Sequence, residues 1–124
     1  EPDLVMKEAL FSSLSSFLKG HNFEGKRLFI RDFDGLAFLT DLLCSDHALR
    51  FRKRILMLFG DLVQYDDNIF GTEPNGDKFY VRRFYSHRDD VILRLMSYTT
   101  TSDLDNMQEQ QMRQLSLRIL FSLH

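Results

Sequence analysis

Few residues in this sequence combine the types and spacing that catalysis requires. The tripeptide His87-Arg88-Asp89 resembles the catalytic-loop motif of protein kinases. The asparagine that should follow it is absent at the expected spacing, and no glycine-rich loop or magnesium-binding aspartate accompanies it. We therefore interpret these three residues as the polar start of a helix.

A second stretch partly fits the register of a calcium-binding loop. Asp66, Asn68, Gly71 and Asp77 occupy several of its positions. However, Phe70 stands at a ligand position, and Asp77 replaces the glutamate that would bind calcium through both oxygens. A solvated turn explains this stretch better, and we predict no metal site and no cofactor.

The single cysteine, Cys44, lies beside an apolar run and is predicted to be a buried small hydrophobic residue. With one cysteine, no internal disulfide can form, as is usual in reducing compartments, although helical proteins elsewhere can also lack bridges. The four histidines are too scattered to be paired by spacing, and no glycine-rich phosphate-binding loop is present. The chain is therefore predicted not to be an enzyme.

Composition places the chain among globular domains. Its 124 residues suffice for one domain, with 44% hydrophobic and 27% charged residues and a net charge of −2. No apolar run approaches the ~20 residues that a membrane span needs. The sequence starts and ends within apolar helical patterns, so we interpret it as part of a longer protein whose targeting signals it does not reveal.

Two basic groups interrupt this neutral background. The first comprises Arg50, Arg52, Lys53 and Arg54, and the second comprises Arg82, Arg83 and Arg88. Each is either a solvated helix face or a contact for an acidic partner surface. Nucleic acid is disfavoured as a partner, because acidic residues are interspersed nearby and the chain has no overall basic excess.

Helical periodicity organises the apolar residues. It predicts helices over 4–19, 26–33, 36–43, 48–65, 88–98 and 108–123, with Asp3 capping the first helix and Gly20 ending it. Turn-forming residues predict a loop over 66–78, and 79–84 is assigned to a helix start or ordered loop rather than a strand. The predicted core includes Leu14, Leu39, Leu58 and Leu62.

A repeat becomes visible when these helices are aligned. The helix end at 14–18 matches 59–63 and 120–124. The first interval is about 45 residues, within the ~40–47 of armadillo and HEAT units, and the second is about 61. The predicted fold is all-α: an armadillo-type right-handed solenoid of about two to three repeats in one domain, with an irregular helical bundle as the alternative. The predicted units are repeat A over 1–20, repeat B over 26–65, an insertion loop over 66–87 and repeat C over 88–124.

Three segments resemble one family. VMKEALFSSLSSFL at 5–18, LFIRDFDGLAFLTDLL at 28–43 and LFGDLV at 58–63 are similar to successive helices of the armadillo-type nucleotide exchange factors of heat-shock protein 70 chaperones. The family's usual Gly-Gly is Asp34-Gly35 here, which still supplies one glycine able to adopt a left-handed conformation. Residues 70–87 match no family motif, and the glycine-leucine pattern also occurs in armadillo proteins generally.

The resemblance implies a function. Such factors bind the second lobe of the chaperone's nucleotide-binding domain, favour its open form and so speed the release of ADP. The long connection after Val63 resembles the endoplasmic-reticulum branch, whose chaperone is BiP, which implies a lumenal location, with the cytoplasm as the alternative. The competing function is a generic armadillo scaffold that binds a peptide or protein along its groove. The chain has no tryptophan, and Ser16, Asp61 and Ser122 stand where peptide-binding grooves carry asparagine, which disfavours that scaffold.

Aligning the three matched helices also predicts a binding surface. In an armadillo stack, the third helix of each repeat lines the concave face, so residues one turn apart form a ladder across the repeats. The predicted partner-binding residues are Ser12, Ser16, Arg54, Met57, Asp61, Gln114, Arg118 and Ser122. For Asp61 a second interpretation is that it pairs with a nearby basic side chain.

Overall fold

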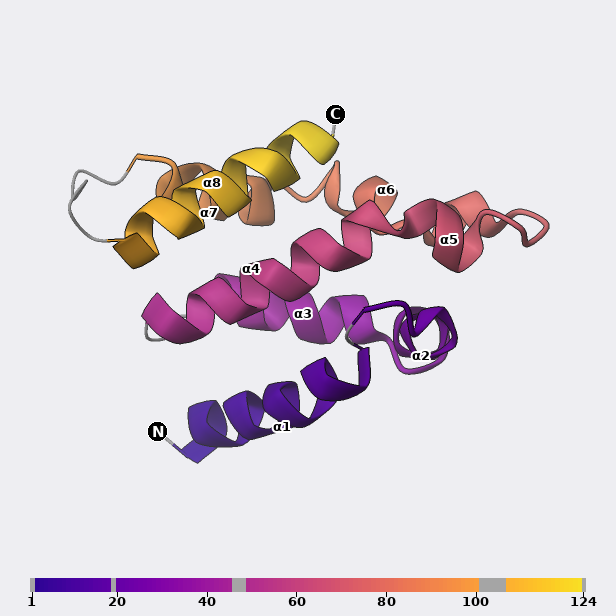
Figure 1. Cartoon of the computed structure of the whole chain (residues 1–124), viewed down its shortest axis with the longest axis horizontal. Helices are drawn as coiled ribbons and strands as arrows, with labels where there is room; N and C mark the ends of the chain where they lie inside the picture. Colours follow the sequence, from indigo (N-terminus) through magenta and orange to yellow (C-terminus); the bar gives the residue numbers. More distant parts are fainter. Residues whose placement is uncertain (1, 19, 46–48, 101–106, 124) are drawn as a thin grey trace.

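A computed structural model describes residues 2–18, 20–45, 49–100 and 107–123. All regular structure in these ranges is helical, and no strand occurs in them, which confirms the all-α prediction (Figure 1). The elements are α1 (Pro2–Leu18), α2 (Phe23–Arg27), the π-helical turn η1 (Leu28–Asp32), α3 (Gly35–Cys44), α4 (Leu49–Gln64), α5 (Asp66–Phe70), the 3₁₀ turn η2 (Gly76–Phe79), α6 (Val81–Tyr85), α7 (Asp89–Tyr98) and α8 (Met107–Ser122).

The first helix, α1, ends at Leu18, and the predicted last residue, 19, lies outside the described residues. Gly20 follows α1 with a φ of 70°, the left-handed conformation that glycine adopts most easily at a helix end. The start differs by a few residues, because the helix begins at Pro2 and so includes Asp3 rather than following it. Proline is well suited to a first turn, since its missing N–H would have no helical partner there.

The conformations of Asp34 and Gly35, which break the chain before α3, differ from our expectation. Asp34, and not Gly35, adopts the left-handed conformation, with a φ of 52°. Gly35 is instead the first residue of α3, and a Cβ atom there would lie 2.5 Å from both the ring and the carbonyl oxygen of Phe29. The glycine therefore permits a close approach of η1 to α3.

The structure also differs from the loop that we predict over 66–78. Residues 66–70 form α5 and residues 76–79 form η2, and α6 follows directly. Asp66 begins α5, and Asn75 precedes η2 with a φ of 57°. Asp and Asn favour helix starts as well as turns, so their presence does not distinguish a loop from a chain of short helices. The assignment of 79–84 to a helix start rather than a strand is confirmed.

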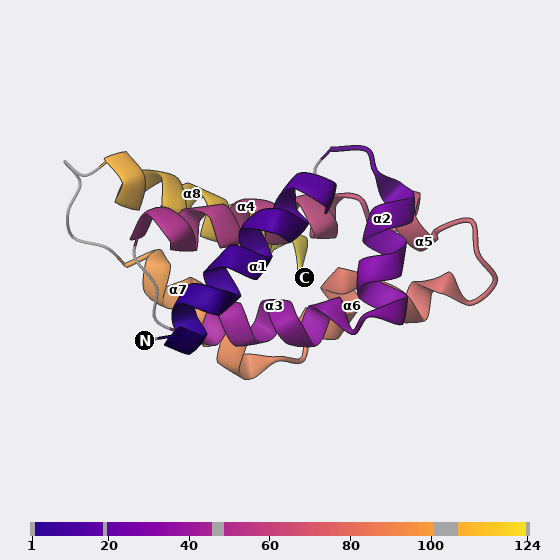
Figure 2. The same cartoon turned by 90° about the horizontal axis from the view of Figure 1, so that it is seen from below.

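Successive helices stack in matching pairs. In contact are α2 with α5, α3 with α7 and α4 with α8. Helices α4 and α8 lie side by side and run in the same direction (Figure 1). Seen from below, α1 covers α4 with α3 beside it (Figure 2). Three helices of the 23–64 segment thus pack, in the same chain order, on three helices of the 66–122 segment, and η1, η2 and α6 stand outside this pairing.

Buried side chains fill the space between these helices. Three of the predicted core residues, Leu39, Leu58 and Leu62, are buried, whereas Leu14 is only partly buried. Tyr85 is fully buried, and its hydroxyl lies 2.8 Å from the Thr40 hydroxyl and donates to the Leu36 carbonyl at 3.0 Å. This network satisfies the one polar atom of the Tyr85 side chain and joins α6 to α3.

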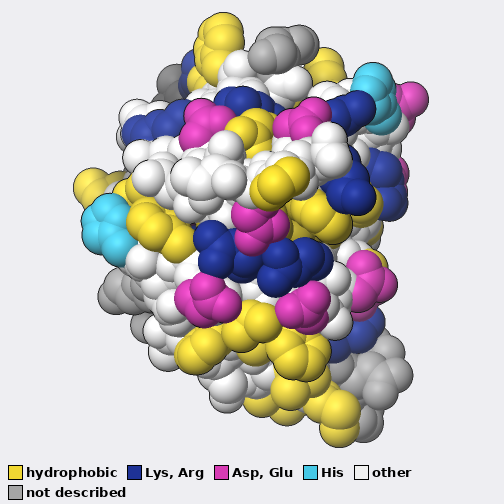
Figure 3. Space-filling view, turned by 90° about the vertical axis from the view of Figure 1, so that its right-hand side faces the viewer, with side chains coloured by type: hydrophobic (Ala, Val, Ile, Leu, Met, Phe, Trp, Pro, Cys, Tyr) yellow, Lys and Arg dark blue, Asp and Glu magenta, His cyan; other side chains and the backbone are white. Residues whose placement is uncertain are grey.

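Ion pairs join the short helices at one end of the molecule. The Arg27 guanidinium donates twice to the Ile69 carbonyl, at 3.0 and 2.9 Å, and lies 3.1 Å from Glu73. Arg31 also pairs with Glu73, at 3.0 Å. The corresponding face shows basic side chains bordered by acidic ones, with hydrophobic side chains gathered below them (Figure 3). These contacts hold α2 against α5, and η1 against the turn that follows α5.

Candidate functional site

A groove of about 300 Å³ runs between α4 and α8. Four of the eight predicted partner-binding residues line it: Met57 and Asp61 from α4, and Arg118 and Ser122 from α8. The full lining is Met57, Gly60, Asp61, Val63, Gln64, Leu115, Arg118, Ile119 and Ser122. The pairing of the two matched helices therefore brings two rungs of the predicted ladder together.

The sequence of α4 explains which residues reach the groove. Ile55, Phe59 and Leu62 lie on the buried side of the helix, at the spacing of successive turns. Met57 lies on another side and keeps 54% of its surface exposed. Methionine is a flexible apolar side chain that is common at protein-binding surfaces. The helix thus uses one face for the core and another for the groove.

Gly60 forms part of the groove floor. A Cβ atom at this position would meet only Ile119, at 3.6 Å and 3.8 Å, which are ordinary van der Waals distances. The packing of α4 on α8 therefore does not require a glycine here. The missing side chain instead leaves the groove deeper at this point than alanine or a larger residue would.

Asp61 has a partner within the molecule. Its Oδ2 lies 3.1 Å from Nζ of Lys26, which has no exposed surface. The same ammonium donates to the Gly20 carbonyl and lies 4.8 Å from the ring centre of Tyr65 and 5.4 Å from that of Phe23. The interpretation of Asp61 as the partner of a basic side chain is thus confirmed, and its negative charge is balanced at the groove edge.

The other four predicted residues do not line the groove. The Arg54 guanidinium lies 5.8 Å from the ring centre of Phe11 and 5.7 Å from that of Phe51, at the contact between α1 and α4. On α1, the Ser16 hydroxyl donates to the backbone carbonyl of Ser12. Gln114 is exposed on α8. The rung on α1 is therefore separate from the groove.

Charge is unevenly distributed over the chain. Helices α4 and α8 together carry six basic and two acidic residues, whereas the whole chain has 16 basic and 18 acidic ones. The basic residues are Arg50, Arg52, Lys53, Arg54, Arg113 and Arg118, and the acidic ones are Asp61 and Glu109. Within the described part of the chain, Arg118 forms no ion pair. Of these eight residues, only Asp61 and Arg118 line the groove, and Arg118 is its one basic side chain.

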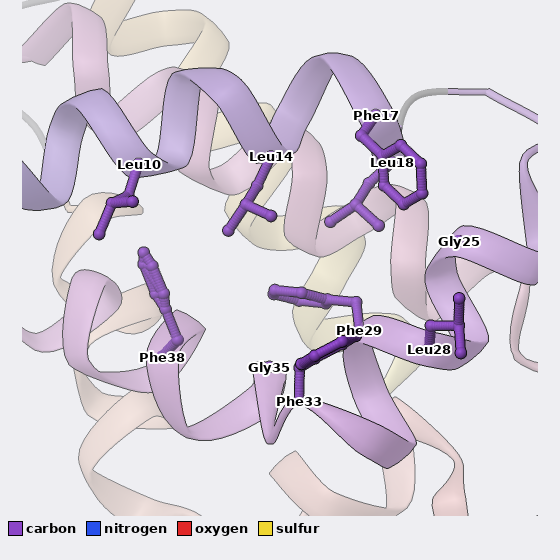
Figure 4. Close-up of a pocket in the computed structure, with 10 residues that line it drawn as sticks. All are labelled: Leu10, Leu14, Phe17, Leu18, Gly25, Leu28, Phe29, Phe33, Gly35 and Phe38. Carbon is purple, nitrogen blue, oxygen red and sulfur yellow. The ribbon is translucent and has the colours of Figure 1, made fainter.

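A second groove, of about 360 Å³, lies between α1 and the η1–α3 segment (Figure 4). Only apolar side chains and glycines line it: Leu10, Leu14, Phe17, Leu18, Gly25, Leu28, Phe29, Gly35, Phe33 and Phe38. This location explains why Leu14 is only partly buried. The groove has no polar side chain to orient a ligand, and specific sites usually combine apolar walls with a few such groups. The smaller α4–α8 groove is therefore the better functional candidate.

The structure corrects the expectation for Cys44, which is exposed rather than buried. It is the last residue of α3, and the last position of a short helix is easily left uncovered. Its sulfur lies 3.8 Å from Oδ2 of Asp90. Partial burial of the sulfur and the negative charge of Asp90 both raise the pKa of the thiol, which opposes formation of the nucleophilic thiolate.

Asp66 is the most important residue that the sequence analysis missed, because we assign it to a solvated turn. It is buried, and its two carboxylate oxygens accept hydrogen bonds from the N–H groups of Val81, at 2.7 Å, and Arg82, at 3.1 Å. It thereby caps α6 from a distant helix. Burial raises its pKa to about 6, although these hydrogen bonds favour the charged form. No local pattern signals a capping interaction across 15 residues.

The remaining chemical candidates have structural roles. Arg88 precedes α7 and pairs with Asp90 at 3.0 Å, as expected for the polar start of a helix. Among the described residues, no group of three or more His, Cys, Asp or Glu side chains could hold a metal ion. In the same ranges, no helix is both long enough and apolar enough to cross a membrane.

Comparison with family models, with curated proteins and with solved structures finds no match to this chain.

Proposed function

We propose that this chain is part of an armadillo-type nucleotide exchange factor that binds the nucleotide-binding domain of a heat-shock protein 70 chaperone. The observation that carries the proposal is the matched stacking of α2 on α5, α3 on α7 and α4 on α8. Each set runs from a short helix through a medium one to a 16-residue helix, as expected for consecutive armadillo units. The sequence resemblance supplies the chaperone partner.

The spacing of the contacts supports the repeat. Arg27 of α2 bonds to Ile69 of α5, 42 residues later, which is close to an armadillo period. The longer interval between α4 and α8 arises after α5, where η2 and α6 precede α7. An insertion between the first and second helices of a unit would lengthen the repeat without disturbing the α4–α8 pair.

The proposed mechanism is a shift in population. The factor binds the second lobe of the chaperone's nucleotide-binding domain more tightly when that domain is open, and ADP leaves faster from the open form. A tenfold increase in the open-to-closed ratio requires about 1.4 kcal/mol of differential binding. The exposed α4–α8 groove offers the contact surface, and no side chain of this chain needs to react. The proposed compartment is the endoplasmic-reticulum lumen, with BiP as the partner.

The test is ADP release from two purified chaperones, BiP and a cytosolic heat-shock protein 70, measured by stopped-flow fluorescence of a labelled ADP with and without the full chain. We expect faster release from BiP and a weaker effect on the cytosolic protein. The isolated substrate-binding domain of BiP serves as the binding control, and it should not be retained by the immobilised chain. If neither nucleotide-binding domain binds and neither release rate changes, the proposed function is wrong; a stronger effect on the cytosolic chaperone would overturn the lumenal assignment alone.

A further inference from the structure

We infer that the α4–α8 groove recognises an acidic protein segment in which an apolar side chain stands beside a carboxylate. The apolar side chain would lie over Gly60, and the carboxylate would bind Arg118. This inference rests on the proposed function and specifies the chemistry of its partner at that site.

The shape of the groove supports an apolar anchor. Gly60 leaves the floor open, and Leu115, Ile119 and Met57 provide apolar surface around it. Met57 is more than half exposed in the isolated chain. Covering such a side chain with a partner's apolar residue removes both surfaces from water, which favours binding. A small apolar pocket beside polar groups is also the usual arrangement of an interface anchor.

The charges of the groove support an acidic partner. Asp61 and Arg118 are the two charged residues of its lining, and they are not equivalent. Asp61 is paired with the buried Lys26, so its charge is already balanced within the molecule. Arg118 is exposed and has no ion pair within the described ranges. An arginine can bind a carboxylate through two parallel hydrogen bonds, which gives direction as well as attraction.

The other charged residues of α4 and α8 also favour an acidic partner. The basic excess of α4 and α8 attracts acidic surfaces and repels basic ones before contact is made. Nucleic acid would share the negative charge but would not supply a flexible aliphatic side chain for the floor at Gly60. The combination of a cation and an apolar hollow therefore favours a protein segment.

The first experiment uses a short fluorescein-labelled peptide in which a leucine and a glutamate lie one helical turn apart, so that their side chains are neighbours on one helix face. A matched peptide carries glutamine in place of the glutamate. Binding to the full chain is measured by fluorescence anisotropy. We expect Arg118→Glu to weaken binding of the glutamate peptide at least about tenfold, a change of about 1.4 kcal/mol. Arg113→Glu is the matched control, because Arg113 is exposed on the same helix but outside the groove; it should change affinity less than about threefold. Gly60→Leu should block binding by filling the floor.

Thermal melts must first show that the variants remain folded. Equal binding of the glutamate and glutamine peptides would overturn the role of the carboxylate. Equal weakening by Arg118→Glu and Arg113→Glu, or equally tight binding of a short single-stranded DNA, would overturn specific recognition at the groove.

Repeating the titration with the nucleotide-binding domain of BiP separates the two proposals. Loss of domain binding in Arg118→Glu but not in Arg113→Glu supports both. If the peptide binds through Arg118 and the domain does not bind at all, the proposed function is wrong and the groove assignment stands. If the domain binds the Arg118→Glu and Gly60→Leu variants as it binds the parent, the groove assignment is wrong and the proposed function stands.

Discussion

Nζ of Lys26 lies 3.1 Å from Oδ2 of Asp61, and this pair joins the buried side of α2 to the edge of the α4–α8 groove. The two members have different surroundings. Lys26 is fully buried and is also held by the Gly20 carbonyl and two aromatic rings, whereas 27% of the Asp61 side chain is exposed. The pair therefore stabilises the fold at the same place where it balances the charge of the groove.

Substituting Asp61 should lower the free energy of unfolding more than substituting Lys26. Asp61→Asn leaves a buried ammonium without its counter-charge, so we expect it to lower the free energy of unfolding by about 3 kcal/mol. Lys26→Met should cost less, because the remaining carboxylate reaches water and methionine fills the same space. The double variant should resemble Lys26→Met alone, since the uncompensated charge is gone. Urea melts of the parent and the three variants measure this, and additive losses would contradict the pairing.

The buried carboxyl of Asp66 predicts a pH dependence of stability. Burial raises the pKa of this carboxyl to about 6 in the folded chain, from its ordinary value of 3.8. Between these values the folded state binds more protons than the unfolded state, so this group makes the free energy of unfolding fall as pH rises from about 4 to about 6. The slope cannot exceed about 1.4 kcal/mol per pH unit for a single group.

The measurement compares Asp66→Asn with the parent across this range. The asparagine does not titrate, so the stability of Asp66→Asn relative to the parent should increase as the pH rises from about 4 to about 6. Asp89→Asn is the control, because Asp89 is an exposed aspartate in the first turn of another helix, α7. A stability difference that is constant with pH, or one that decreases, would show that the folded chain does not raise the pKa of Asp66.

Arg27 and Arg31 form a natural comparison, because they lie on neighbouring turns and share Glu73. Arg27 also donates two hydrogen bonds to the Ile69 carbonyl at the end of α5, and 19% of its side chain is exposed. We expect Arg27→Ala to destabilise by about 2 kcal/mol, since charged hydrogen bonds to a backbone carbonyl are lost. Arg31→Ala removes a more exposed pair that water and salt screen, so it should cost clearly less than Arg27→Ala. Denaturant melts measure the loss in free energy of unfolding for each variant. Equal losses would mean that the Arg27 hydrogen bonds to Ile69 are not what holds α2 against α5.

Periodicity located the helices because each depends on residues close together in the chain. Leu39, Leu58 and Leu62 are buried as their spacing indicates, and Gly20 ends α1 by its own backbone preference. Alignment of the helix ends also placed Met57 and Arg118 at one groove, because matched helices stack in register.

Other features depend on which residues meet in space, and these the sequence did not reveal. Asp66 caps a helix that begins 15 residues later, and Lys26 finds its partner on another helix. The exposure of Cys44 depends on what covers the end of α3, and the partial burial of Leu14 depends on the width of the groove beside α1. Contacts between residues far apart in the chain produce no periodic pattern in the sequence, so periodicity does not predict them.

Two glycines inside helices give opposite predictions for the same substitution. Gly60→Ala places a methyl group 3.6 Å from Ile119 and replaces the poorest ordinary helix former with the best, so we expect it to stabilise the chain by about 0.5–1 kcal/mol. Gly35→Ala places a methyl group 2.5 Å from the Phe29 carbonyl oxygen, which is backbone and cannot rotate away, so we expect destabilisation. Thermal melts should therefore move in opposite directions. If Gly60→Ala raises the melting temperature yet weakens binding of the acidic peptide, the glycine serves the groove and not the fold. If it lowers the melting temperature, the floor at Gly60 is tighter than the structure indicates, and the space assigned to a partner's side chain is not there.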